Sequence, residues 1–124
     1  MTDFLDLQRD VLEWAHVKGI LAKSDIKTQL CKTMEELGET MGAVLKGNQE
    51  EIIDGIGDMV VTLIIASHIS GLDIVQCLDS ANNVIQKRSG LMVDGVFVKD
   101  APKDLDKMQN YWYRAKYGQW SRDR

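Results

Sequence analysis

The chain has 124 residues, a length that fits a single domain with a modest hydrophobic core. Hydrophobic residues make up 44% of it and charged residues 27%, a balance that excludes a disordered or fibrous chain. The formal net charge of -4 argues against passive nucleic-acid binding, which needs a basic surface. The same charge suits an anionic substrate only if metal ions intervene.

Membrane and secreted proteins are disfavoured as well. The longest apolar stretch, residues 59–69, is interrupted by polar side chains and is too short to span a bilayer. The acidic N-terminus does not resemble a signal peptide, and Cys31 and Cys77 show no pairing pattern. We therefore expect a cytoplasmic protein with neither a membrane nor a nucleic-acid partner.

Helices are predicted first along the chain. One is expected over residues 3–17, with Thr2 as its N-cap and Gly19 just past its end. A second is expected from Asp25 to about Lys46, capped by Ser24 and closed by Gly47. Its apolar residues recur at helical spacing: Leu30, Met34, Leu37, Met41, Val44 and Leu45.

A third helix is expected over residues 49–70, with Asn48 as its N-cap and Gly71 at its end. Its second half is apolar nearly all round, which is typical of a helix enclosed by others. A fourth helix is predicted from Asp73 to about Arg88.

A different pattern follows the fourth helix. Two short apolar runs flank Asp94-Gly95 and predict a β-hairpin over about 91–98. A last helix is expected over about 103–118. The predicted fold is therefore all-α: one domain, residues 1–124, in which an antiparallel helical bundle over about 3–88 carries a small hairpin and a final helix.

Acidic residues gather on two of these helices. At about 100° per residue, Glu35 and Glu39 lie within roughly 40° of each other, and Glu36 lies roughly 60° from Glu39. Asp54 and Asp58 share a face of the next helix, which the turn near Gly47 folds back alongside. The neighbouring glycines would let the two backbones approach closely: Gly38, Gly55 and Gly57.

Carboxylates this close repel one another, and a divalent cation would offset that repulsion. Ligands that are all oxygen select Mg²⁺ or Mn²⁺ over zinc. A solvated acidic stripe is the alternative interpretation of the same pattern. A di-iron bundle would need a Glu-x-x-His pair, which the sequence lacks, and His16 and His68 lack zinc-ligand spacing.

A wider pattern surrounds these acids. The stretches 14–20, 29–39 and 54–63, followed by Asn83, Arg88 and residues 92–99, occur in the order seen in MazG-like proteins. The chain thus resembles the all-α NTP pyrophosphatase superfamily, and its short, single-domain phage-type members in particular. That superfamily carries Glu-Glu-x-x-Glu and, further on, Glu-x-x-Asp. The chain departs from it at Gly55, where the family has glutamate, so Asp54 or Glu51 would have to replace that carboxylate.

The resemblance implies a function and a site. The function is hydrolysis of a nucleoside triphosphate to the monophosphate and pyrophosphate, with two or more Mg²⁺ ions per site that Mn²⁺ can replace. Glu36 would orient or deprotonate the attacking water. The implied metal ligands are Glu35, Glu36, Glu39, Asp58 and Asp54, and the implied substrate contacts are Trp14, Gln29, Lys32, Asn83, Lys87 and Arg88. For each substrate contact, an ordinary core or surface position is the alternative.

Phage-type members manage nucleotide pools, and those of the MazZ type remove dGTP, so a purine deoxynucleotide is expected as substrate in a host cytoplasm. The resemblance also implies a homodimer or homotetramer whose second subunit closes the pocket. Two other functions fit the same residues. One is phosphoribosyl-ATP pyrophosphohydrolase activity, and the other is a non-catalytic, oligomeric helical module whose acids bind a cation.

Overall fold

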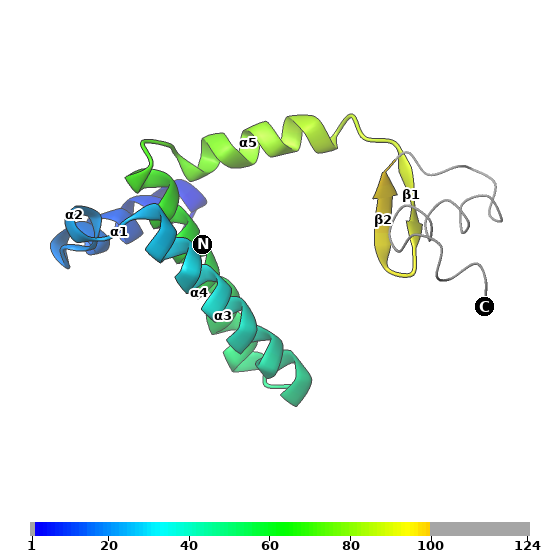
Figure 1. The fold of residues 1–124 in the computed structure, drawn as a ribbon, viewed down its shortest axis with the longest axis horizontal. Helices are drawn as coiled ribbons and strands as arrows, with labels where there is room; N and C mark the ends of the chain where they lie inside the picture. Colours follow the sequence, from blue (N-terminus) through cyan, green and yellow to red (C-terminus); the bar gives the residue numbers. More distant parts are fainter. Residues whose placement is uncertain (1, 100–124) are drawn as a thin grey trace. The chain divides into compact units, whose positions relative to one another are not determined.

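The computed structural model of the chain describes residues 2–99. The final helix expected over about 103–118 lies outside these residues. The chain divides into two compact units, residues 1–79 and 80–124, and each is described here by itself. The described part is mostly helical and ends in a two-stranded hairpin, as predicted (Figure 1).

Two helices begin the first unit. Helix α1 (Phe4–Val17) is capped by Asp3, whose carboxylate accepts a hydrogen bond of 2.9 Å from the Asp6 amide. The predicted cap, Thr2, is therefore wrong by one residue. A four-residue helix, α2 (Ile20–Lys23), follows Gly19 and was not predicted, because so short an element shows no periodicity.

Helices α3 (Ile26–Lys46) and α4 (Gln49–Ile69) lie side by side as a hairpin (Figure 1). Gly47, at φ 71°, ends α3 in the left-handed conformation, as predicted. Asn48 caps α4 by accepting from the Glu51 amide at 3.2 Å, also as predicted. The cap of α3 is Asp25 rather than Ser24, since Asp25 accepts from the Thr28 amide at 2.7 Å.

Small and polar residues line the contact between α3 and α4. The Thr33 and Thr62 hydroxyl oxygens lie 2.7 Å apart across it. Thr40 and Ala43 of α3 and Gly55 of α4 are also buried. The apolar row from Leu30 to Leu45 does not line this contact and remains exposed. The contact between α3 and α4 thus contributes few large side chains to the core.

The apolar core of this unit lies near the C-terminal half of α4, where α1 contacts it. Ile64, Ile65 and Ala66 are buried there, as is Ala15 of α1. Helix α4 is also long and apolar enough to cross a membrane, with a mean hydropathy of 1.7. Core helices of soluble proteins meet the same criterion, so this composition does not by itself indicate a membrane protein.

Helix α5 (Ile74–Ile85) runs from the first unit into the second and ends three residues before the predicted end at Arg88. Strand β1 (Gly90–Val93) then pairs antiparallel with β2 (Val96–Lys99). Asp94 and Gly95 connect them with φ angles of 50° and 81°. Positive φ at both central residues defines the tight turn that Asp-Gly predicts.

Candidate metal and nucleotide site

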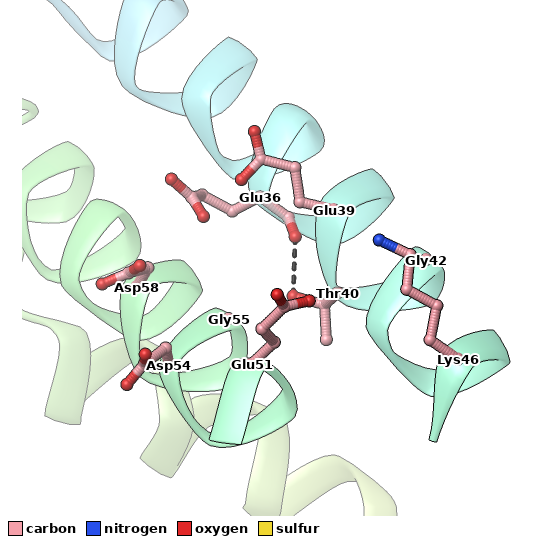
Figure 2. Close-up of a pocket in the computed structure, with 9 residues that line it drawn as sticks. All are labelled: Glu36, Glu39, Thr40, Gly42, Lys46, Glu51, Asp54, Gly55 and Asp58. Carbon is pink, nitrogen blue, oxygen red and sulfur yellow. Dashed lines mark hydrogen bonds between the residues drawn. The ribbon is translucent and has the colours of Figure 1, made fainter. Parts of the chain in front are cut away.

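The acids of α3 and α4 face a shared open cavity of about 420 Å³ (Figure 2). Its lining comes from one face of the helical hairpin and consists of Glu36, Glu39, Thr40, Gly42, Lys46, Glu51, Asp54, Gly55 and Asp58. Five of these are carboxylates and one is an ammonium, so the cavity is strongly acidic. None of the histidine and cysteine residues within 2–99 lines it.

Four of the five predicted metal ligands line this cavity: Glu36, Glu39, Asp54 and Asp58. Glu35 does not line it. The Glu35 carboxylate instead lies 3.6 Å from the Lys32 ammonium, and both side chains are about half exposed. The position of Glu35 on the helical wheel, close to Glu39, therefore does not by itself bring its side chain into the lining of this cavity.

Thr40 and Gly55 set how closely the two helices approach. A Cβ atom at position 55 would overlap the Thr40 hydroxyl and would lie 3.0 Å from Thr40 Cβ. The hydroxyl itself donates to the Glu36 carbonyl at 2.7 Å (Figure 2). Position 55 therefore has no room for the glutamate of the family pattern. Gly38 and Gly57, also predicted to permit close approach, have open space around them.

Glu36 is the carboxylate most affected by its surroundings. Its pKa is raised above the ordinary value, first by desolvation and then by the negative charges of Glu39 and Asp58. Lys32 opposes this rise in the pKa only in part. The two helices thus bring the carboxylates of Glu36, Glu39 and Asp58 close enough for their negative charges to act on one another.

The side chains do not form a finished cation site. Among residues 2–99, no three histidine, cysteine, aspartate or glutamate side chains are grouped closely enough to hold a metal ion. A cation would therefore have to draw exposed carboxylates such as Glu39 and Asp54 inward by side-chain rotation. The backbone positions of the acids, on two packed helices, are already fixed.

The predicted substrate contacts are distributed over both units. Trp14 on α1 is 49% exposed, whereas Gln29 is 8% exposed and donates from Nε2 to the Ser24 hydroxyl at 3.0 Å. Gln29 thus holds the start of α3 in place. Asn83 lies on α5, and Lys87 and Arg88 lie in the turn after it, all within the second unit.

The two histidines line a separate cavity of about 540 Å³ formed by α1 and the end of α4. Asp73, at the start of α5, also lines it. The pKa of Asp73 is lowered by the Val75 amide, by the Gln8 side chain and by nearby His68. These contacts tie α5 to α1 and give the histidines a structural environment, away from the acidic cavity.

Three lining residues had not been predicted for the site: Thr40, Gly42 and Lys46. Glu51 had been considered only as a substitute for the carboxylate missing at Gly55. Thr40 was missed because its importance depends on Gly55 across the contact. Glu51 and Asp58 are seven residues apart and therefore lie within about 20° on α4, a relation that the sequence does display.

Comparisons with known proteins place the chain only broadly. No protein-family model and no solved structure matches it. An uncharacterised 18.2 kDa protein from the rep-hol intergenic region of Haemophilus phage HP1 is 32% identical over 75 residues. The match covers 60% of this chain and 46% of the phage protein. The chain is thus similar to part of a phage protein.

Proposed function

We propose that the chain is a MazG-like nucleoside triphosphate pyrophosphohydrolase that requires Mg²⁺ or Mn²⁺. The observation that carries the proposal is the cavity between α3 and α4, in which Glu36, Glu39 and Asp58 come from the two family motifs. The similarity to a phage protein agrees with a phage-type member, although the function of that relative is not known.

The donors of the cavity fit a hard divalent cation. All its acidic ligands are carboxylate oxygens, and Thr40 adds a hydroxyl. The pKa of Glu36 is raised first by desolvation and then by the negative charges of Glu39 and Asp58, and a cation would offset those charges. Glu36, Glu39 and Asp58 would hold the ion, with Asp54 or Glu51 in place of the carboxylate missing at position 55. Glu35 is a weaker candidate, because it pairs with Lys32 outside the cavity lining.

Bound there, Mg²⁺ would neutralise charge on the phosphate chain and make water a stronger nucleophile. Glu36 would accept the proton of the attacking water, and its pKa, raised above the ordinary value by desolvation and by the neighbouring acids, makes it a stronger base than a free glutamate. Water adds to a phosphorus at the α–β bridge, the bridging P–O bond breaks, and the monophosphate and pyrophosphate separate. Lys46 lines the same cavity and would attract the phosphates.

The substrate is proposed to be a purine deoxynucleotide such as dGTP, in keeping with the phage-type resemblance. We continue to predict contacts to its base, sugar and phosphates from Trp14, Asn83, Lys87 and Arg88.

The test is a panel of the eight common NTPs and dNTPs, together with phosphoribosyl-ATP, assayed with Mg²⁺ or Mn²⁺. We expect pyrophosphate and monophosphate as products, and we expect Glu36→Gln to lower kcat by at least 100-fold with the helical content unchanged. Glu50→Gln is the matched control, because Glu50 is an exposed acid of α4 outside the cavity lining.

Each alternative has its own result. Orthophosphate as the main product would contradict cleavage at the α–β bridge. Preference for phosphoribosyl-ATP would assign the related pyrophosphohydrolase activity instead. Metal binding without product from any nucleotide would support the non-catalytic helical module.

A further inference from the structure

Among residues 2–99, Lys46 is the only basic residue that lines the acidic cavity. It follows Glu39 by seven residues on α3 and therefore lies within about 20° of the same face. Figure 2 shows its side chain running back along α3 past Gly42, where a Cβ atom would meet open space. The Lys46 ammonium forms no ion pair with a carboxylate of residues 2–99. It is therefore available to a bound anion.

The register of the two helices separates this lysine from the acids in the middle of the hairpin. Thr40 meets Gly55 across the contact, and Asp58 lies close enough to Glu36 to affect its pKa. Lys46 is six residues beyond Thr40 in the direction of the turn that joins α3 and α4. It is ten residues from Glu36, or about 15 Å along the helix axis. The cavity thus has Glu36 and Asp58 at one end and a lysine at the end nearer the turn.

The carboxylate missing at position 55 would have stood between these two ends. Thr40 leaves no room for it, and Glu51 lies one turn, about 6 Å, nearer to the Lys46 end. Mg²⁺ is usually held by one or two carboxylates and completes its shell with water and substrate phosphates. The acids at the far end therefore suffice for one ion. A second ion near the turn would be repelled by the Lys46 ammonium.

On the basis of the proposed function, we propose that the cavity takes one divalent cation and that Lys46 binds the terminal phosphates of the nucleotide in place of a second ion. The ion would be held by Glu36, Glu39 and Asp58. This differs from the two or more ions that the family resemblance implies. An ammonium is a compact charge with three hydrogen-bond donors, which suits phosphate oxygens. Lys46 would offset the negative charge of the two phosphates that leave as pyrophosphate.

The same arrangement orients the nucleotide and selects its length. Trp14, the predicted base contact, lies on α1, which lines a cavity with His68 near the end of α4 that is remote from the turn. The base would thus lie toward α1, and the terminal phosphates would lie toward the turn. A nucleoside diphosphate has one phosphate fewer at the Lys46 end. Lys46 would therefore favour triphosphates over diphosphates.

The first test counts the ions. The full-length chain is titrated with Mn²⁺ in saturating α,β-methylene-dGTP, a triphosphate that is not cleaved at the α–β bridge, and free Mn²⁺ is measured by electron paramagnetic resonance. We expect one bound ion per chain for the wild type. Two or more ions per chain overturn the proposal.

The second test measures the affinity for pyrophosphate in Mg²⁺ by calorimetry. Lys46→Gln should raise the dissociation constant by about 10- to 100-fold, because a hydrogen-bonded charge is lost. Lys27→Gln is the matched control and should bind as the wild type does, since Lys27 is exposed on α3 outside the cavity lining. Equal affinities of the wild type and Lys46→Gln overturn the role of Lys46.

Neither measurement requires turnover, so the two proposals can fail separately. Absence of pyrophosphate release from every nucleotide would contradict the proposed function. Two bound ions, or an unchanged pyrophosphate affinity in Lys46→Gln, would overturn the present inference even for an active enzyme.

Discussion

At the scale of single residues, Gly55 is the position where this chain departs most clearly from the pattern of the family proposed for it, and Thr40 across the helix contact explains why. The Thr40 side chain occupies the space that a Cβ at position 55 would need. Gly55→Ala should therefore lower the free energy of unfolding by about 1–3 kcal/mol, because either the helices separate or Thr40 leaves its rotamer. Chemical denaturation measures this change.

Two further variants distinguish this contact from an ordinary effect of glycine in a helix. Gly57 lies two residues after Gly55 on the same helix, and a Cβ atom there would meet open space. Gly57→Ala should therefore stabilise the protein by about 0.5–1 kcal/mol, because alanine favours a helix more than glycine does. Thr40→Ala should recover part of the loss in Gly55→Ala, which a double-mutant cycle detects as a coupling between the two positions. Additive effects would show that Thr40 does not limit the helix separation.

Glu36 gives a prediction about pH. Because the folded state raises its pKa above the ordinary 4.5, the folded chain binds more protons than the unfolded chain just above that pH. The contribution of Glu36 to stability should therefore be fully present below pH 4.5 and be lost as pH rises through its folded-state pKa in metal-free buffer. Glu36→Gln should remove this loss and melt above the wild type at pH 7, with the two proteins converging below pH 4. A lower Tm for Glu36→Gln at pH 7 would contradict the repulsion described above.

At the scale of elements, the two long helices are joined by a hydrogen bond between hydroxyls. Thr33 and Thr62 lie 2.7 Å apart, and each hydroxyl is also near a carbonyl of its own helix. Thr62→Val should cost about 0.5–1.5 kcal/mol of unfolding free energy, because the partly buried Thr33 loses its partner across the contact. Thr62→Ser keeps the hydroxyl and should lie closer to the wild type in the same denaturation experiment.

The ends of these elements were predictable because the chemistry that sets them is local. Asn48, Gly47 and Asp94-Gly95 act within a few residues of themselves, and each was identified from the sequence. The choice of Asp25 over Ser24 as a cap depends on Gln29, which engages the Ser24 hydroxyl instead. A sequence pattern for N-caps does not show which of two adjacent polar residues caps the helix when one of them has another hydrogen-bond partner.

The contact between helices was harder to predict, because its residues do not follow the hydrophobic pattern. The apolar row on α3 predicts that Leu30 to Leu45 face the core, yet the small and polar row through Thr33, Thr40 and Ala43 faces α4. The acids could be predicted from the sequence, because on each helix they stand close together at a spacing that puts them on one face. Their separation could not be predicted, since it depends on Thr40 meeting Gly55 across the contact.

At the scale of the whole molecule, stability and cation binding should be linked through the acidic cavity. A ligand that binds only the folded state stabilises it by RT ln(1 + [L]/Kd), about 2.7 kcal/mol when the free ligand is at 100 times its Kd. Mn²⁺ or Mg²⁺ should therefore raise the Tm of the wild-type chain relative to EDTA. A bound cation would offset both the desolvation of Glu36 and the negative charges of Glu39 and Asp58 that raise the pKa of Glu36.

The same linkage predicts that the Tm of two variants lies above that of the wild type without metal and below it with metal. In EDTA at pH 7, Glu36→Gln should melt above the wild type, because it removes one of the repelling charges. In saturating Mn²⁺ it should melt below the wild type, because it has lost a ligand, and Asp58→Asn should behave in the same way. Glu50→Gln, outside the cavity, should follow the wild type in both buffers. If Mn²⁺ raised the Tm of all four proteins equally, the ion would be binding elsewhere, and the acidic cavity would be a solvated surface rather than a metal site.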